Sequence, residues 1–136
     1  MHLLLDTNIL IWALNRPEWL PAEAASMIED TANQVAFSAA SVWEIAIKWR
    51  LGRTDFRVRP GVVAQEARNV GFAELSVHAD VAVRVADLPL HHNDPFDRLL
   101  VAQAIAGPMR LLTVDSVLAR YTELVTLVDL PRRQPR

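Results

Sequence analysis

The 136-residue sequence contains no cysteine, which excludes disulfide bonds and metal sites built from thiolates. No apolar run approaches the roughly 20 residues that a membrane-spanning helix needs. The N-terminus also lacks the basic segment of a signal peptide, and Asp6 interrupts its short apolar run. We therefore expect a cytoplasmic protein that does not insert into a membrane.

Length and composition are those of one compact soluble domain. Hydrophobic residues make up 51% of the chain and charged residues 22%. A chain of this size buries roughly two-thirds of its unfolded surface, which is enough for a core without cross-links. We predict a single domain over residues 1–130, followed by a basic and disordered tail over residues 131–136.

Short apolar segments alternate with helical segments along the whole chain. The predicted strands cover residues 2–5, 34–37, 73–76, 110–113 and 124–128, and the predicted helices cover residues 9–14, 21–31, 39–51, 61–69, 77–88, 95–106 and 116–121. This order predicts an α/β fold with a mostly parallel sheet that helices cover on both faces.

Polar side chains at two of the predicted helix starts are suited to cap them. We expect Thr7 or Asn8 to cap the first helix. We expect Ser38 or Ser41 to cap the helix that follows the second strand. In each case a side-chain oxygen would accept a hydrogen bond from an N–H of the first turn, which has no partner within the helix.

The helix predicted over residues 39–51 carries an apolar stripe. Trp43, Ile47 and Leu51 share this stripe, which we expect to face the core. Glu44 lies off the stripe. Its ordinary interpretation is an exposed ion pair with Lys48, worth about 0.3–0.5 kcal/mol. The other interpretation, as part of a site, depends on where the remaining acids lie.

The segment HHNDPFDRLLVAQA, residues 91–104, is typical of a loop that runs into a helix. Asp94 suits the N-cap, Pro95 the first helical position and Asp97 the first turn. Gly107 and the proline after it end the helix. Taken alone, Asp97 is explained as an acid that complements the helix dipole, worth about 0.3–1 kcal/mol.

Four acids from distant parts of the chain have reason to meet. Asp6 and Asp115 fall at or just past the carboxyl ends of predicted strands, where parallel sheets place their ligand sites. Asp97 opens a helix that should start at the same edge of the sheet. Glu44 lies in the first two turns of a helix that follows a strand. We therefore predict that these four residues form one site.

Grouped carboxylates repel each other and are costly to bury, so a fold that gathers four of them is expected to hold a cation. Oxygen ligands without thiolates select Mg²⁺ or Mn²⁺. Such an ion can activate water and stabilise the charge on a phosphodiester, so the predicted reaction is hydrolysis without a protein nucleophile. His91 and His92 could indicate zinc, but an isolated pair in a loop favours a surface or capping role.

Basic residues lie near the four acids in the sequence, and they have two interpretations. Lys48, Arg50, Arg53 and Arg98 could bind phosphates, or they could belong to solvated helix faces. Asp94 is interpreted as the helix cap rather than a ligand. Thr113 could donate a hydrogen bond to a carboxylate, or it could simply end a core strand.

Three other classes of protein compete with a nuclease. A phosphoacceptor receiver domain needs a lysine at the end of a late strand, but the single lysine, Lys48, falls on a predicted helix. A von Willebrand-type metal-adhesion module needs DxSxS after its first strand, which DTNIL does not supply. A catalytically silent RNA- or partner-binding regulator remains as the alternative, because a sequence cannot demonstrate turnover.

Four blocks of the sequence resemble the PIN-domain ribonucleases, and in particular the VapC-type toxins of bacterial toxin–antitoxin pairs. They are LLLDTNILIWAL, SAASVWEIAIKWRLGR, HHNDPFDRLLVAQA and LLTVDSVLARY, and the resemblance spans residues 3 to about 130. It implies a three-layer α/β/α sandwich and Mg²⁺- or Mn²⁺-dependent RNA cleavage. It further implies Asp6 and Asp97 as the main metal ligands, with Asp115 and Glu44 completing the site and positioning water.

The same resemblance implies partners. Proteins of this type are held inactive by an antitoxin and commonly form homodimers. The four tryptophans leave apolar surface that a partner could cover, and Trp19 is the one that we expect to be exposed. The RNA that is cleaved, the number of metal ions and the antitoxin are not encoded in these motifs.

Overall fold

A computed structural model describes residues 1–52 and 58–129. The tail predicted over residues 131–136 lies outside the described residues. So does Arg53, one of the basic residues with two interpretations. The strands form one sheet in the order β3-β2-β1-β4-β5, and every neighbouring pair is parallel. Their bounds are His2–Leu5 (β1), Gln34–Ser38 (β2), Ala73–Leu75 (β3), Arg110–Thr113 (β4) and Val125–Leu127 (β5).

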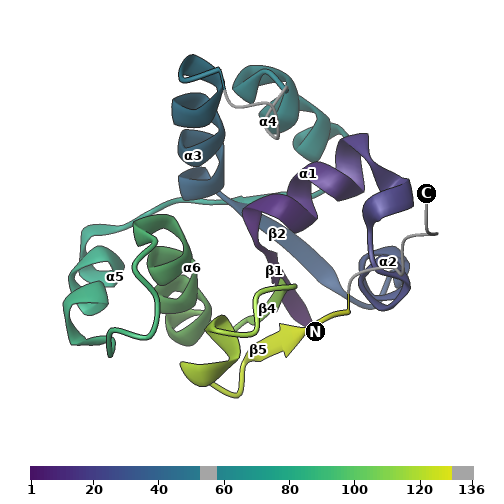
Figure 1. Cartoon of the computed structure of the whole chain (residues 1–136). Coiled ribbons are helices and arrows are strands. Elements are labelled where there is room, and N and C mark those ends of the chain that lie inside the picture. The colour runs from purple at the N-terminus through teal and green to yellow at the C-terminus, as the bar shows by residue number, and fades with distance from the viewer. Residues whose placement is uncertain (53–57, 130–136) are drawn as a thin grey trace, which may run out of the picture.

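Within the described residues, six α-helices connect and cover the strands (Figure 1). Their bounds are Thr7–Asn15 (α1), Ala22–Glu29 (α2), Ala39–Arg50 (α3), Pro60–Asn69 (α4), Ala79–Arg84 (α5) and Pro95–Ala106 (α6). The helix predicted over residues 77–88 is shorter and continues as a 3-10 turn, Val85–Asp87, and the one predicted over residues 116–121 is only a 3-10 turn, Leu118–Arg120. Among the described helices, none is both long and apolar enough to cross a bilayer.

The sheet is buried on both faces, as the strand β1 illustrates. Leu3 and Leu5 point into a core shared with α1, α2, α3 and α4, whereas Leu4 points into a second core shared with α6. All three side chains are completely buried. The helix α5 packs on α6 at the outside of the second layer (Figure 1). The predicted three-layer α/β/α arrangement with a parallel sheet is therefore confirmed.

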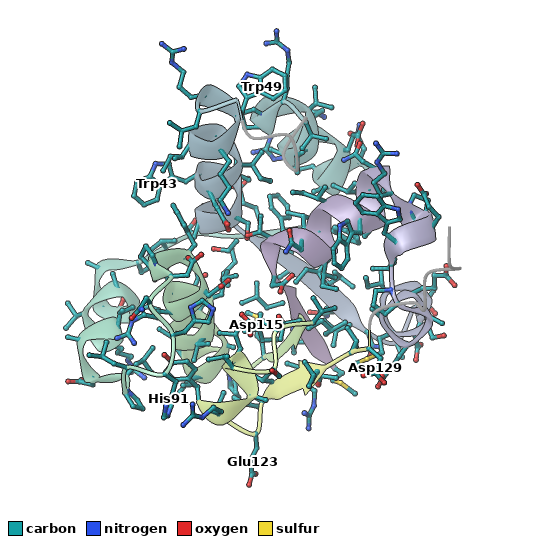
Figure 2. The ribbon with its side chains drawn as sticks, in the orientation of Figure 1. Trp43, Trp49, His91, Asp115, Glu123 and Asp129 are labelled. Atoms are coloured by element: carbon teal, nitrogen blue, oxygen red, sulfur yellow. The ribbon has the colours of Figure 1, made fainter. Side chains whose placement is uncertain are left out.

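The prediction for the faces of α3 is wrong. Trp43 lies on the outer side of α3 (Figure 2), where it is 61% exposed and its ring meets that of Phe96 edge-on, and Leu51 is 70% exposed. The buried residues of α3 are instead Ala40, Ser41, Glu44 and Ile45. Ile45 packs in the core, but the rest of the buried face is small or polar because it meets a polar site, and Trp43 and Leu51 then point outward. Trp19 is 42% exposed, as predicted.

Candidate active site

The end of β1 supplies a buried acid of the site. Asp6 is 6% exposed and follows Leu5 directly. Its Oδ1 accepts a hydrogen bond of 2.8 Å from the backbone N–H of Ile9, so Asp6 itself caps α1. The prediction that Thr7 or Asn8 caps this helix is wrong, because the helix already begins at Thr7. One residue thus ends a strand, starts a helix and faces the site.

The end of β4 supplies a second acid, linked to the first through a threonine. Thr113 is buried and donates its hydroxyl hydrogen to Asp6 Oδ2 at 2.5 Å. The same hydroxyl oxygen accepts a hydrogen bond of 3.1 Å from the backbone N–H of Asp115. Asp115 Oδ1 in turn accepts from Val117 N at 2.9 Å. The hydrogen bond to a carboxylate that was one interpretation of Thr113 is present.

The helix α3 supplies Glu44, which is 4% exposed rather than a surface residue. Thr7 donates its hydroxyl hydrogen to Glu44 Oε1 at 2.6 Å, and the Ser41 hydroxyl lies 3.0 Å from the same Thr7 oxygen. Lys48, one turn further on, forms an ion pair with Glu44 Oε2. The predicted pairing with Lys48 is therefore present, but it holds a carboxylate that is buried. The helix begins at Ala39, and the side chain of Ser38 caps it. Ser38 is one of the two caps that the sequence predicted.

The helix α6 supplies Asp97 in its first turn. Asp94 Oδ1 accepts hydrogen bonds from Phe96 N at 2.8 Å and from Asp97 N at 3.3 Å, which confirms Asp94 as the N-cap. Pro95 occupies the first helical position. The side chain of Asp94 accepts hydrogen bonds from two backbone N–H groups of the first turn, so it fixes where α6 begins. This start places Asp97 in the first turn, near the other acids.

Burial and mutual repulsion perturb two of the acids strongly. The pKa of Asp97 is raised to about 7, chiefly by desolvation and further by the negative charges of Asp94, Asp6 and Glu44, while His92 opposes the rise. Desolvation likewise raises the pKa of Asp6 to about 6, helped by Glu44 and Asp115 and opposed by the hydrogen bonds from Thr113 and Ile9 N. Asp6 therefore lies within electrostatic reach of the other three predicted acids, and Asp97 also lies within reach of Glu44.

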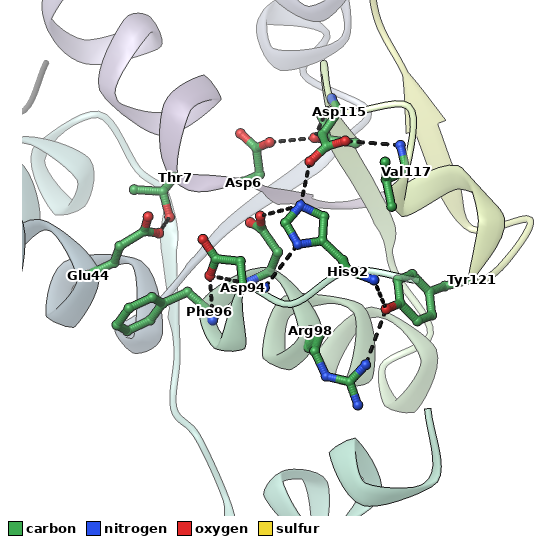
Figure 3. A network of polar contacts seen from close by, with 12 residues as sticks. Asp6, Thr7, Glu44, His92, Asp94, Phe96, Arg98, Asp115, Val117 and Tyr121 are labelled. Atoms are coloured by element: carbon green, nitrogen blue, oxygen red, sulfur yellow. Dashed lines mark hydrogen bonds and ion pairs between the residues drawn. The ribbon is translucent and has the colours of Figure 1, made fainter. Parts of the chain in front are cut away.

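His92 lies at the site, although the sequence favoured a surface or capping role for it. Its Nε2 lies 2.8 Å from Asp115 Oδ2 and 3.5 Å from Asp97 Oδ2. One potential ligand atom from each of these three residues lies within 4.8 Å of the other two. Figure 3 shows the ring reaching up from the loop before α6 toward Asp115. The signals in the sequence were the adjacent pair of histidines and the position of His92 five residues before Asp97, and neither is distinctive.

Arg98 is not a phosphate ligand, in contrast to one of its two interpretations. The side chain is buried, and its guanidinium donates to the carbonyl oxygens of Val85, Leu88 and Pro89 and to the hydroxyl of Tyr121. These bonds hold the segment before α6 against the helix. A buried guanidinium whose donors are used in this way stabilises the loop that carries His92.

The donor set fits a hard divalent cation. The candidate ligand atoms that lie together are two carboxylate oxygens and one imidazole nitrogen, and the chain has no thiolate to favour a softer metal. The raised pKa values of Asp6 and Asp97 indicate negative charges that are crowded and desolvated. A cation among these oxygens would relieve that repulsion, so the residues present fit the ion.

The sequence over residues 3–124 matches the family described as PIN domain. This range includes β1, β4 and all four acids. The chain belongs to the PIN domain family. The chain is also similar to Ribonuclease VapC16 of Mycobacterium tuberculosis (strain ATCC 25618 / H37Rv), to which it is 39% identical over 66 residues. The match covers 47% of this chain and 47% of that protein, so it spans about half the length of the relative.

Solved structures with the same fold extend the likeness to nearly the whole PIN domain. VapBC2 from Rickettsia felis, bound to a DNA fragment from their promoter, has a TM-score of 0.67 and 18% identity, and the match covers 96% of this chain and 100% of that one. VapBC-1 from nontypeable Haemophilus influenzae has a TM-score of 0.63 and 18% identity, with coverage of 95% and 98%. A toxin–antitoxin complex from Klebsiella pneumoniae has a TM-score of 0.61 and 22% identity, with coverage of 90% and 94%. At these identities the likeness establishes the fold.

Proposed function

We propose that this PIN domain is a Mg²⁺- or Mn²⁺-dependent endoribonuclease and the toxin of a toxin–antitoxin pair. The observation that carries the proposal is the cluster of Asp97 and Asp115 with His92, together with the charges of Asp6 and Glu44, which lie close enough to raise the pKa of Asp97. The partial match to a protein named ribonuclease supports RNA as the substrate. Family membership supports a nuclease rather than a receiver or adhesion domain.

The four acids have two tasks in this proposal. Asp6, Asp97 and Asp115 would hold the divalent ion, which when bound would supply a water of lowered pKa and stabilise charge on the phosphodiester. Glu44 orients the attacking water, and Thr7 and Lys48 fix its carboxylate. Thr113 keeps the Asp6 carboxylate turned toward the site. The burial of Asp6 and Glu44 strengthens these interactions, because little bulk water screens them.

We also propose an antitoxin as the partner and a homodimer as the free form. The structural relatives are VapBC and toxin–antitoxin assemblies. Exposed apolar side chains on the described surface would suit an interface, notably Trp19, Trp43 and Trp49. Copurification with the product of a neighbouring short reading frame tests the first proposal, and sedimentation of the isolated protein tests the second.

The decisive experiment uses a panel of single-stranded and structured RNAs with the full-length protein. We expect cleavage with Mg²⁺ or Mn²⁺, and none with EDTA or with the Asp97→Asn variant. Asp94→Asn is the matched control, because it removes an acid from the same turn while asparagine remains a good helix cap. We expect this control to cleave RNA.

Two outcomes would contradict the proposal. Cleavage by Asp97→Asn at the wild-type rate would remove this carboxylate from the mechanism. Tight RNA binding without cleavage by any metal-loaded sample would favour the alternative, a catalytically silent RNA-binding regulator. Circular dichroism of each variant ensures that a loss of cleavage is not a loss of fold.

A further inference from the structure

We propose that His92 is a positioning residue that holds Asp115 in place for the divalent ion and does not bind the ion itself. The inference rests on the proposed function, because it concerns the same metal site. It begins from an ambiguity in the geometry. An imidazole nitrogen 2.8 Å from one carboxylate and 3.5 Å from another could be a fourth metal ligand or a hydrogen-bond donor.

The backbone around the ring removes this ambiguity. The N–H of Asp94 donates to Nδ1 of His92 at 3.0 Å, and a backbone N–H can only donate. Nδ1 therefore carries the lone pair, and in the neutral ring the proton is on Nε2. That Nε2–H points at Asp115 Oδ2. To bind a cation, Nε2 would have to give up its proton to Nδ1, which would bring two N–H donors face to face at 3.0 Å.

Asp115 needs such a partner more than the other acids do. Its side chain is 34% exposed and stands beyond the end of β4 on a turn. Val117 N donates to Oδ1 and His92 donates to Oδ2, so the carboxylate is held from both sides. Each oxygen keeps a second lone pair for a cation. Hydrogen bonds of this kind orient metal-binding carboxylates in proteins.

The loop that carries His92 is itself anchored. The hydroxyl oxygen of Tyr121 accepts a hydrogen bond of 2.8 Å from the backbone N–H of His92 and one of 3.2 Å from Arg98 (Figure 3). Arg98 also binds three carbonyl oxygens of the preceding segment. A chain of contacts thus runs from the interior of α6 through Tyr121 and His92 to Asp115. These contacts give His92 and Arg98 a role in the HHNDPFDR motif, which the four acids alone do not explain.

Long-range ¹H–¹⁵N NMR of the histidine rings tests the assignment without any measurement of activity. We expect the His92 ring to be the Nε2–H tautomer in the metal-free protein, and to remain so when Mg²⁺ is added. Conversion to the Nδ1–H tautomer on addition of Mg²⁺ would overturn the proposal, since it would identify Nε2 as a ligand. Electron spin-echo measurements on the Mn²⁺-loaded protein test the same point, because a directly bound ring nitrogen couples strongly to the metal. We expect no such coupling from His92.

Titration calorimetry with Mg²⁺ alone measures what His92 contributes. We expect His92→Ala to weaken Mg²⁺ binding by about 10- to 100-fold, the effect typical of lost hydrogen bonds to metal ligands. His92→Gln should recover most of the affinity, because its amide N–H can take the place of Nε2–H. The exposed His78, which makes no capping hydrogen bond at the start of α5, provides the control His78→Ala. Wild-type affinity in His92→Ala would contradict the proposal.

These measurements separate this inference from the proposed nuclease. If the protein binds Mg²⁺ through a site that depends on His92 but cleaves no RNA, the nuclease proposal fails and the positioning role stands. If the wild-type protein cleaves RNA while the ring changes tautomer with Mg²⁺, the positioning role fails and the nuclease stands. Should His92→Ala not fold, the NMR experiment on the wild-type protein and the His92→Gln titration still decide the question.

Discussion

The two central strands end in acids of opposite character. Asp6, at the end of β1, is 6% exposed, caps α1 and has its pKa raised to about 6. Asp115, two residues past β4, has a side chain that is 34% exposed and stands on a turn. The first acid is part of the fold, and its charge is a cost to the folded state. The second acid is an addition to the rim, held there by His92 and Val117.

The contrast follows from the chain path at each strand end. β1 passes directly into α1, so the carboxylate of Asp6 is enclosed between a strand and the first turn of a helix. β4 instead passes into an irregular segment and a short 3-10 turn, which leaves Asp115 open to water. Thr113 joins the two ends, since it donates to Asp6 and accepts from the backbone of Asp115. The proposed metal site would therefore combine one ligand fixed by the core with one held by hydrogen bonds at the rim.

The largest expected effect is on stability against pH in the absence of metal. The pKa values of Asp6 and Asp97 rise from 3.8 to about 6 and about 7, so the folded state binds protons more tightly than the unfolded state. A pKa that differs by one between the folded and unfolded states changes the free energy of unfolding by about 1.4 kcal/mol. This free energy should therefore fall by several kcal/mol as the pH rises from about 4 to about 8. Urea unfolding in EDTA measures this fall.

Asp6→Asn and Asp115→Asn separate the two acids in that experiment. Asp6→Asn should flatten the pH dependence and hold or raise the melting temperature of the metal-free protein at about pH 8, because it removes a buried charge and keeps a helix cap. Asp115→Asn should leave most of the pH dependence in place. A drop of many degrees in Asp6→Asn would make Asp6 a structural residue, and an equal flattening by both variants would remove the contrast between them.

Thr113→Val should have an intermediate effect. The substitution keeps the shape of the side chain but leaves Asp6 Oδ2 and the N–H of Asp115 without their partner. We expect a loss of about 1–3 kcal/mol in the free energy of unfolding, together with a further rise in the pKa of Asp6. Thr126→Val on the neighbouring edge strand β5, where the hydroxyl meets only Arg110 at 3.4 Å, is the matched control. Equal losses in the two variants would mean that Thr113 does not link the strand ends.

The smallest expected effect is that of Asp115→Asn on the metal-free protein at about pH 8. A partly exposed acid outside the core should change the free energy of unfolding by no more than about 0.5 kcal/mol. Its effect should appear instead as weaker Mg²⁺ binding in calorimetry. A loss of about 2 kcal/mol or more from the metal-free protein would show that Asp115 supports the fold as Asp6 does, and the comparison would have to be abandoned.

The comparison of sequence and structure is most instructive in α3. The apolar stripe of Trp43, Ile47 and Leu51 has ordinary helical spacing, yet the helix is rotated so that Glu44 and Ser41 point inward. The spacing identified a helix but could not say which face is buried, because the buried partners include polar residues of α1. Thr7 donates a hydrogen bond to Glu44, and the two residues are 37 positions apart in the chain. A pattern within one helix carries no information about such a contact.

The start of α6 shows the opposite relation, because local patterns there do predict the structure. Asp94, Pro95 and Asp97 behave as the sequence predicts, because capping and first-turn positions depend on neighbours within three residues. Arg98 and His92 do not follow from the sequence, since their partners belong to other elements. Tyr121 receives hydrogen bonds from both, and Asp115 receives one from His92. Their roles became visible only when the end of β4 was placed beside the start of α6.

The sequence by itself determined the alternation of strands and helices, and with it the parallel sheet at whose carboxyl edge acids collect. Local hydrogen bonding and alternating burial govern those features, and both are written in neighbouring residues. The tertiary structure alone decided which acids are buried, which face of α3 turns inward and which nitrogen of the His92 ring bears the proton. Those properties depend on desolvation and on partners far away in the chain, and no local pattern encodes either.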